Sequence, residues 1–483
     1  MNPIAVRLGF VPSYRWSYTE WVDQMRRESL AAFAQVPGVE IICPQPAPDG
    51  KTVDPQSGVT SHGCVNTLDE VEAVVATFRR EGVDGLILSP LDFGDERSLV
   101  KVAEQMGLPV LLFATKEPPA NNDAMLSRVS DSYCGNLSIA AGLHRRKIPF
   151  QYAGLFFPSE PELRAAVMDF AGAVAVVKGL RNARIGQVGV RPSAFETVAF
   201  DEIAMARKFG QNVIPAELSD LVDQAQRIAE DDPRVLEAIA RARASAATVT
   251  VAEDYLVNSA RLEVALADFW QRNRLSAIAI QCWPSIGKLM KVSLCALYGR
   301  MTDATMLTAC ETDVLGAVSM LVSYQSALGA SVPHFIDWTI QHRDHPNRLL
   351  AWHCGNAPTS LAADPARVAL RSRTNMSGEL PVEVGDAMAG LFQFQIKPGR
   401  VTLCRLAEYD GQWKMLIAGG EIVPSDETLG GTWSWVEVKD HARLYRTLVE
   451  EGFIHHASMI HGDQRAALLQ ACKFLDIQPV WVD

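Results

Sequence analysis

The chain has 483 residues, of which 48% are hydrophobic, and a formal net charge of -11 at pH 7. Its length is enough for two or three domains with large cores, while its acidic balance argues against a nucleic-acid-binding surface. No segment approaches the length of a membrane span, and the apolar run near the start is too short for a secretory signal. We expect a cytoplasmic protein that acts on a small molecule, with neither nucleic acid nor membrane as a partner.

Segments typical of strands and helices alternate through the first 160 residues. The expected strands cover residues 4–11, 39–42, 85–88 and 109–113, and the expected helices cover 21–33, 67–80, 96–106 and 136–146. A stretch rich in proline and phenylalanine, 147–162, predicts a loop. This alternation predicts a doubly wound parallel sheet, and we place the first α/β domain at residues 1–165.

The same alternation continues through residues 166–345, where we expect a second doubly wound α/β domain. The expected strands are 184–190, 213–214 and 277–280, and the helical stretches are 162–178, 215–245, 251–272 and 285–298. Arg191 and Gln281 directly follow two of these strands. Because open α/β sheets bind ligands beyond the carboxyl ends of their strands, both residues are candidate substrate contacts.

Two acids mark the end of this second region. Glu311 closes the short apolar run 306–310, Asp313 can cap a following helix, and Asp337 closes a second short strand, 334–336. We interpret this stretch as one βαβ unit, whose parallel strands would bring Glu311 and Asp337 together at one sheet edge. Converging carboxylates repel each other unless they share a proton or flank a cation such as Mg²⁺ or Mn²⁺. The alternative is that each acid caps a helix or pairs with an arginine.

Beyond residue 345 the pattern changes to short alternating runs separated by turn residues. These runs predict antiparallel strands that form a small barrel or sandwich, and we place this C-terminal β-rich domain at residues 346–483. His455 and His456 stand in an apolar stretch there; because adjacent residues of a strand face opposite ways, at most one should reach a given site. His353 precedes a turn at Gly355 and Asn356 that could approach a ligand.

The nine cysteines are scattered and include no CxxC pair. Three of them, Cys282, Cys310 and Cys354, each lie near a candidate site residue. We expect all three to act as small apolar residues in packing. The sequence contains no P-loop, HExxH or GxSxG motif. The chemistry must therefore come from Glu311, Asp337 and a histidine, a set that can move a proton between neighbouring carbons of a polyol.

Three segments, TACETDVLGAVSML at 308–321, HFIDWT at 334–339 and IHHASMIHGD at 454–463, occur in an order that resembles the L-fucose isomerase family. The resemblance implies two α/β domains followed by an antiparallel β barrel-like domain. It also implies an aldose-ketose isomerase that works through an enediol and binds Mn²⁺, or alternatively Mg²⁺. The family's metal ligands map onto Glu311, Asp337 and His456, and the two acids are also the implied catalytic groups. Gln281 and the turn from His353 to Asn356 resemble substrate-contacting segments.

The resemblance further implies a closed homo-oligomer, commonly a hexamer, in which one subunit's N-terminal domain covers a neighbour's site. Tyr14, Arg15, Trp16 and Trp21 would form that cover, with packing of the first helix as the alternative.

The substrate stays open among three possibilities. We place a neutral aldose such as L-fucose or D-arabinose first. A sulfonated hexose, converted from sulfoquinovose to sulfofructose, is the alternative, because Arg15 and Arg191 follow strands and could meet an anion. A sugar-binding protein without catalysis is the second alternative.

Overall fold

The computed structural model describes residues 4–118, 129–283, 285–372 and 389–482. The chain forms two compact units. The first takes the residues up to 178 together with 473–476, and the second takes 179–472 together with the last strand of the chain. The domain boundaries near residues 165 and 345 stay predictions.

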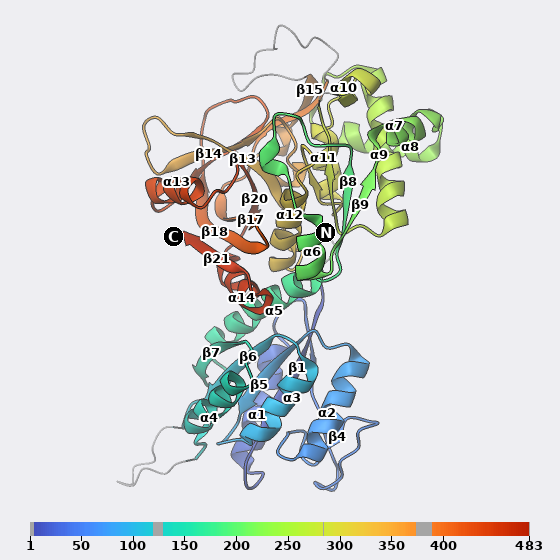
Figure 1. Cartoon of the computed structure of the whole chain (residues 1–483). Helices are drawn as coiled ribbons and strands as arrows, with labels where there is room; N and C mark the ends of the chain where they lie inside the picture. Colours follow the sequence, from blue (N-terminus) through green and yellow to red (C-terminus); the bar gives the residue numbers. More distant parts are fainter. Residues whose placement is uncertain (1–3, 119–128, 284, 373–388, 483) are drawn as a thin grey trace. The chain divides into compact units, whose positions relative to one another are not determined.

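The first unit contains the predicted parallel sheet, with strand order β2-β1-β5-β6-β7 (Figure 1). Its strands are β1 (Val6–Ser13), β2 (Val39–Ile42), β5 (Gly85–Pro90), β6 (Val110–Thr115) and β7 (Phe150–Phe156), and two short strands, β3 (Gln45–Pro46) and β4 (Val59–Thr60), pair separately. Its helices are α1 (Glu20–Phe33), α2 (Leu68–Glu81), α3 (Glu96–Met106), α4 (Ser132–Arg145) and α5 (Pro161–Leu180). β5 and β6 are buried along their whole length, as expected for strands covered on both faces.

Local signals explain where these helices begin and end. Thr67 and Glu70 form a reciprocal capping box at the start of α2, and Gly82 ends the helix at a φ of 66°. The loop predicted at 147–162 was wrong in part, because β7 lies within it and pairs with β6. β7 is an edge strand of intermediate burial, so its sequence lacks the continuous apolar run of its neighbours.

The second unit begins with a four-stranded parallel sheet of order β12-β11-β8-β9. Its strands are β8 (Arg184–Val188), β9 (Asn212–Ala216), β11 (Ala277–Ile280) and β12 (Thr308–Ala309). Its helices are α6 (Glu202–Phe209), α7 (Leu218–Arg227), α8 (Pro233–Ala244), α9 (Glu253–Asn273), α10 (Ser285–Met290) and α11 (Cys295–Asp303).

A ten-stranded mixed sheet forms the rest of this unit, with order β10-β15-β16-β19-β14-β13-β20-β17-β18-β21, and β18 pairs with β19 as well. The strands are β10 (Thr248–Val249), β13 (His334–Gln341), β14 (Arg348–His353), β15 (Ala369–Ser372), β16 (Ala389–Gln395), β17 (Gly399–Tyr409), β18 (Gln412–Val423), β19 (Thr432–Glu437), β20 (His456–His461) and β21 (Gln478–Val482). Two helices, α13 (His441–Glu450) and α14 (Arg465–Leu475), accompany them. The prediction of antiparallel strands is wrong in part, because β10 and β15, β16 and β19, and β18 and β21 pair in parallel. The barrel-like form of this region stays a prediction.

The predicted βαβ unit is wrong. β13 lies in the mixed sheet, antiparallel to β14 and β20, and not beside β12. The reason is the intervening helix α12 (Val314–Ser326), which is buried at every position except Gln325. A helix that is apolar all round needs cover on both sides, and α12 contacts β8, β11 and β12 on the parallel sheet and β17 and β20 on the mixed sheet (Figure 1). The chain therefore leaves one sheet before α12 and enters the other after it.

Within the described residues, the structure has no helix both long and apolar enough to cross a membrane.

Candidate metal centre

Three of the predicted site residues meet at the imidazole of His456, the first residue of β20. Its Nε2 atom lies 2.9 Å from Oε2 of Glu311 and 3.5 Å from Oδ1 of Asp337. Asp337 stands directly opposite His456 in the β13–β20 pairing, and Glu311 arrives from the end of β12. Both acids therefore lie beside the same imidazole nitrogen, although two different sheets carry them.

Glu311 reaches the cluster through an unusual turn. Glu311 and Thr312 have φ values of 60° and 56°, a left-handed conformation that costs non-glycine residues of order 1 kcal/mol or more each. The turn is held from both sides: Thr312 Oγ1 donates to the carbonyl of Val190 at 3.1 Å, and Trp283 Nε1 donates to Glu311 Oε1 at 3.0 Å. These two hydrogen bonds hold the turn and the Glu311 carboxylate in place.

A buried ion pair holds the other nitrogen of His456. Nδ1 lies 2.9 Å from Oδ2 of Asp313, and Arg405 Nη2 donates to Asp313 Oδ1 at 2.9 Å. Asp313 also caps α12, because its Oδ1 accepts from the Gly316 N–H at 2.8 Å. A carboxylate on one imidazole nitrogen fixes the tautomer and ring orientation for a ligand on the other.

The charges of this cluster favour ionised carboxylates. Burial opposes ionisation of Asp313, but the charge of Arg405 and the hydrogen bond of His456 outweigh it and hold the Asp313 pKa well below its usual value. Burial likewise opposes ionisation of Glu311, yet His456 lowers the Glu311 pKa. For His456, burial is outweighed by its hydrogen bonds to Asp313 and Glu311, which raise its pKa to about 9.

The residues present fit a divalent cation. Asp337 Oδ1 is a buried oxygen with no hydrogen-bond partner among the described residues, which is costly unless a ligand satisfies it. Ligand atoms of Asp337, His353 and His456 lie within 4.8 Å of one another, as do those of Glu311, His455 and His456. The two groups share His456, and each joins one carboxylate to imidazole nitrogens, which are ligands that Mn²⁺ accepts.

The expectation that only one of the paired histidines could reach the site is wrong. The rings of His455 and His456 have centroids 4.0 Å apart, and both offer nitrogens near Glu311. The reason is that β20 begins at His456, so His455 lies before the strand and does not follow its alternation. His461 lies at the far end of β20, where its Nε2 is 3.0 Å from the carbonyl of Lys397.

A loop that follows β8 lies over this cluster. The Phe195 ring packs edge-on against Trp283 at 5.6 Å and His455 at 5.2 Å between centroids. Gln281, a predicted substrate contact, braces the start of the loop, because its Oε1 accepts from the Val190 N–H at 3.2 Å. Exposed Arg191 lines a cavity of about 550 Å³ beside Thr312, the neighbour of Glu311.

The other predicted substrate contacts of this unit lie on the mixed sheet. His353, the last residue of β14, has its ring centroid 6.4 Å from that of His456. Asn356 is buried with both ends of its amide engaged: Oδ1 lies 3.1 Å from His334 Nε2, and Nδ2 donates to the Phe335 carbonyl at 3.1 Å. Asn356 thus fixes the strand that carries Asp337, and its role toward substrate stays a prediction.

The aromatic and arginine residues near the start of the chain belong to the first unit. The Arg15 guanidinium stacks 4.1 Å from the Phe93 ring centroid and 5.1 Å from that of Trp16. Trp16 is 76% exposed, whereas Tyr14 is buried. The predicted cover of a neighbouring subunit's site by these residues stays a prediction.

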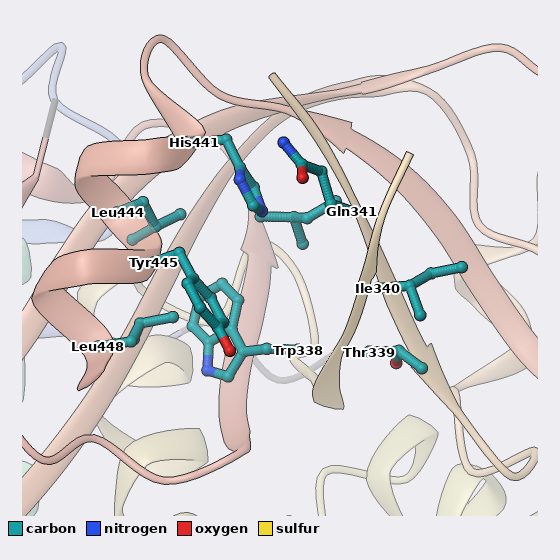
Figure 2. Close-up of a pocket in the computed structure, with 9 residues that line it drawn as sticks. Trp338, Thr339, Ile340, Gln341, His441, Leu444, Tyr445 and Leu448 are labelled. Atoms are coloured by element: carbon teal, nitrogen blue, oxygen red, sulfur yellow. The ribbon is translucent and has the colours of Figure 1, made fainter. Parts of the chain in front are cut away.

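Trp338 follows Asp337 on β13, and the alternation of the strand sends its side chain to a separate pocket. Figure 2 shows Trp338 opposite Tyr445 and Leu448 of α13, with His441 and Gln341 at the other end. This cavity of about 260 Å³ is lined by none of the cluster residues.

Sequence reasoning missed three residues that build the site. Arg405 was not predicted as a site residue, because its partner, Asp313, is 92 positions away in the sequence. Trp283 follows β11 and has no local feature that points to Glu311. Asp313 was predicted only as a helix cap, and the signal for its second role was its place two residues after Glu311 in the same short motif.

Comparison with known proteins gives two family matches and several relatives. Residues 47–181 match the fucose/sulfoquinovose isomerase N-terminal domain, and residues 351–481 match the L-fucose isomerase C-terminal domain. A sulfoquinovose isomerase of Alkalicoccus urumqiensis is 24% identical over 83% of this chain and 86% of its own length. Proteins of the same name from Priestia megaterium and Clostridium sp. are 23% and 24% identical, over 86% and 81% of this chain and 89% and 85% of their own lengths.

Among solved structures, a periplasmic solute binding protein from Actinobacillus succinogenes with bound D-allose covers 67% of this chain and 90% of its own, at 10% identity and a TM-score of 0.17. A likeness this low carries no argument about this chain.

Proposed function

We propose that this chain, which belongs to the L-fucose isomerase family and is an isomerase, converts sulfoquinovose to sulfofructose with Mn²⁺ held by Glu311, Asp337 and His456. The observation that carries the choice of substrate is the set of relatives named sulfoquinovose isomerase, which align over more than four fifths of this chain. This reverses the order of the two substrates expected from the sequence, while family membership removes the sugar-binding protein from consideration.

Arg191 supplies a physical reason for an anionic substrate. No acidic residue in the described part of the chain lies within ion-pair distance of its guanidinium. It lines a cavity with Ser193 and Thr312, and Thr312 adjoins Glu311. A guanidinium and a hydroxyl match the three oxygens of a sulfonate through charge-assisted hydrogen bonds. We assign the sulfonate end of the sugar to this cavity.

We assign different roles to Asp337 and Glu311 in the proton transfer. When bound, the cation would polarise the O1 and O2 atoms of the open-chain sugar and stabilise the charge that develops as the C2 proton leaves. Oε1 of Glu311 accepts a hydrogen bond from Trp283, which would remain when His456 Nε2 gives up its proton to bind the cation. Oδ1 of Asp337 accepts none among the described residues. We therefore assign Asp337 as the base that removes the C2 proton and returns it to C1, and Glu311 as the fixed ligand. The hydroxyl proton of O2 passes to O1, so the composition of the sugar is unchanged.

A neutral aldose stays the second candidate, because the C-terminal match is to the L-fucose isomerase domain. The chemistry at C1 and C2 would be the same for a neutral aldose as for sulfoquinovose. Only the far end of the sugar would change, since a neutral sugar leaves Arg191 facing solvent.

The test compares four sugars in D₂O with the Mn²⁺-loaded protein and follows deuterium entry at C1 and C2 by NMR. Sulfoquinovose is set against quinovose, which has the same hydroxyls but no sulfonate, and against L-fucose and D-arabinose. We expect exchange in sulfoquinovose at least about tenfold faster than in quinovose, the ratio that one charge-assisted contact supplies. Exchange in L-fucose or D-arabinose alone would establish the neutral aldose instead.

Variants at Arg191 separate the sulfonate contact from the chemistry. Arg191→Gln should raise KM for sulfoquinovose while kcat changes little, because the lost contact binds ground state and transition state alike. Arg191→Lys, the matched control, should retain part of the affinity through its charge. Equal KM values in all three proteins would remove Arg191 from the substrate site.

A further inference from the structure

A pair of thiols lies beside the candidate metal centre and takes no part in the proposed mechanism. The Sγ atoms of Cys282 and Cys310 are 3.1 Å apart, and both lie within 4.8 Å of a carboxylate oxygen of Glu311. Cys282 is half-buried and Cys310 is buried. The sequence suggested only apolar packing for each cysteine, but two sulfurs and a carboxylate that share one small volume form a donor set.

The fold explains why these three groups meet. β11 and β12 are parallel neighbours, so the segments that follow them begin at the same sheet edge. Cys282 and Trp283 follow β11, and Cys310 and Glu311 follow β12. Trp283 donates its indole hydrogen to Glu311, which ties the two segments together at the residues adjoining the thiols.

We infer that Cys282, Cys310 and Glu311 form a second metal position that takes a soft divalent cation such as Zn²⁺. Thiolates select Zn²⁺ over Mn²⁺, whereas carboxylates suit Mn²⁺. Three protein ligands and one water complete the four-coordinate geometry of zinc, and the thiol protons leave to solvent. Two sulfurs at about 2.3 Å from a tetrahedral ion lie about 3.8 Å apart, so the present pair needs to open by about 0.7 Å.

Glu311 is a ligand in both proposed metal positions, so a cation on the thiols should affect the Mn²⁺ position. A zinc ion on the thiols takes Glu311 away from Asp337 and His456, so Zn²⁺ should inhibit the enzyme and Mn²⁺ should relieve the inhibition. This consequence rests on the proposed function, whereas binding of a soft cation by the thiols does not.

The binding test uses the reduced full-length protein titrated with Co²⁺, a zinc substitute whose thiolate ligands give a charge-transfer absorption band. We expect the band to saturate at one equivalent and Cys282→Ser to weaken Co²⁺ binding in this band at least about tenfold. Cys134→Ser, which changes an exposed cysteine of α4, is the matched control and should leave the band unchanged. No band in the wild type, or the same band in Cys282→Ser, would overturn the inference.

Two further arms keep the outcomes apart. Cys310→Ser removes the buried thiol and should abolish the band while leaving the circular dichroism spectrum unchanged. If Cys310→Ser does not fold, the result for Cys282→Ser alone decides. Asp337→Asn should keep the band while losing Mn²⁺ at the proposed centre. A thiolate band in a protein that isomerises none of the four sugars would leave the zinc position standing and remove the proposed function.

Inhibition is measured at the lowest Mn²⁺ concentration that gives full activity, because excess Mn²⁺ should relieve it. The Zn²⁺ concentration for half inhibition should rise at least about tenfold in Cys282→Ser, whose activity without zinc should equal that of the wild type. Inhibition that is equal in both proteins would show that zinc acts elsewhere and would refute the shared use of Glu311.

Discussion

Asp313→Asn tests how the protein aims His456 at the metal. The side chains of Asp313 and Arg405 are 0% and 3% exposed, and loss of one partner from such a buried ion pair costs about 3–5 kcal/mol because the other charge stays buried. Asparagine keeps the side-chain volume and remains a good helix cap. The expected loss of about 3 kcal/mol in the free energy of unfolding therefore reports the missing charge rather than a damaged α12.

The same substitution should weaken metal binding. An outer carboxylate that orients a histidine ligand is worth about tenfold to one-hundredfold in metal affinity, so we expect Asp313→Asn to raise the Kd for Mn²⁺ by that factor. Urea unfolding measures the stability, and isothermal titration with Mn²⁺ measures the affinity.

A double variant separates the two effects. Asp313→Asn with Arg405→Met removes both buried charges, so most of the stability should return, while the Mn²⁺ affinity should stay low because His456 still lacks its charged partner. Wild-type stability and affinity in Asp313→Asn would refute the reasoning. Recovery of affinity along with stability in the double variant would show that Asp313 acts only through the fold.

Three further outcomes are expected. Glu311→Gln and Asp337→Asn should each lower kcat by at least about a hundredfold with an unchanged circular dichroism spectrum, and activity near the wild-type level would exclude that residue from the site. Dialysis against a chelator should abolish sugar isomerisation and Mn²⁺ should restore it, whereas activity that survives metal removal would exclude a metal role. Burial, assisted by the charge of His353, lowers the pKa of His334 to about 3. As the pH falls below 6.5, the His334 imidazole is therefore protonated in the unfolded chain but not in the folded one. The free energy of unfolding should drop by about 2 kcal/mol between pH 7 and pH 5. His334→Gln should lose that difference in urea unfolding at the two pH values, and an equal drop in both proteins would assign it to other groups.

The sequence predicted the convergence of Glu311 and Asp337 through an arrangement that the structure does not have. The expected route was one sheet with two parallel strands, but the sides of α12 are apolar all round, and a helix of that kind separates two sheets. Both acids still lie beside His456, because they follow short apolar runs on either side of the same helix. Local patterns identified the residues, while the pairing of β13 with β20 depends on contacts far apart in the sequence.

The groups around the metal ligands were harder to predict for a similar reason. Arg405 lies in the middle of a strand whose other residues are mostly apolar, and nothing in its local sequence points to Asp313. The position of His455 depends on where β20 begins, and a shift of one residue decides whether strand alternation applies to it. The cap at Asp313 could be predicted because its partner, Gly316, lies three residues away.

The most direct test of the proposed centre is a crystal grown with Mn²⁺ and measured at the manganese absorption edge. We expect one anomalous peak per chain, with oxygens of Glu311 and Asp337 and Nε2 of His456 at about 2.0–2.3 Å. A peak bound by other residues, or no peak in a protein that isomerises its sugar at the same Mn²⁺ concentration, would contradict it.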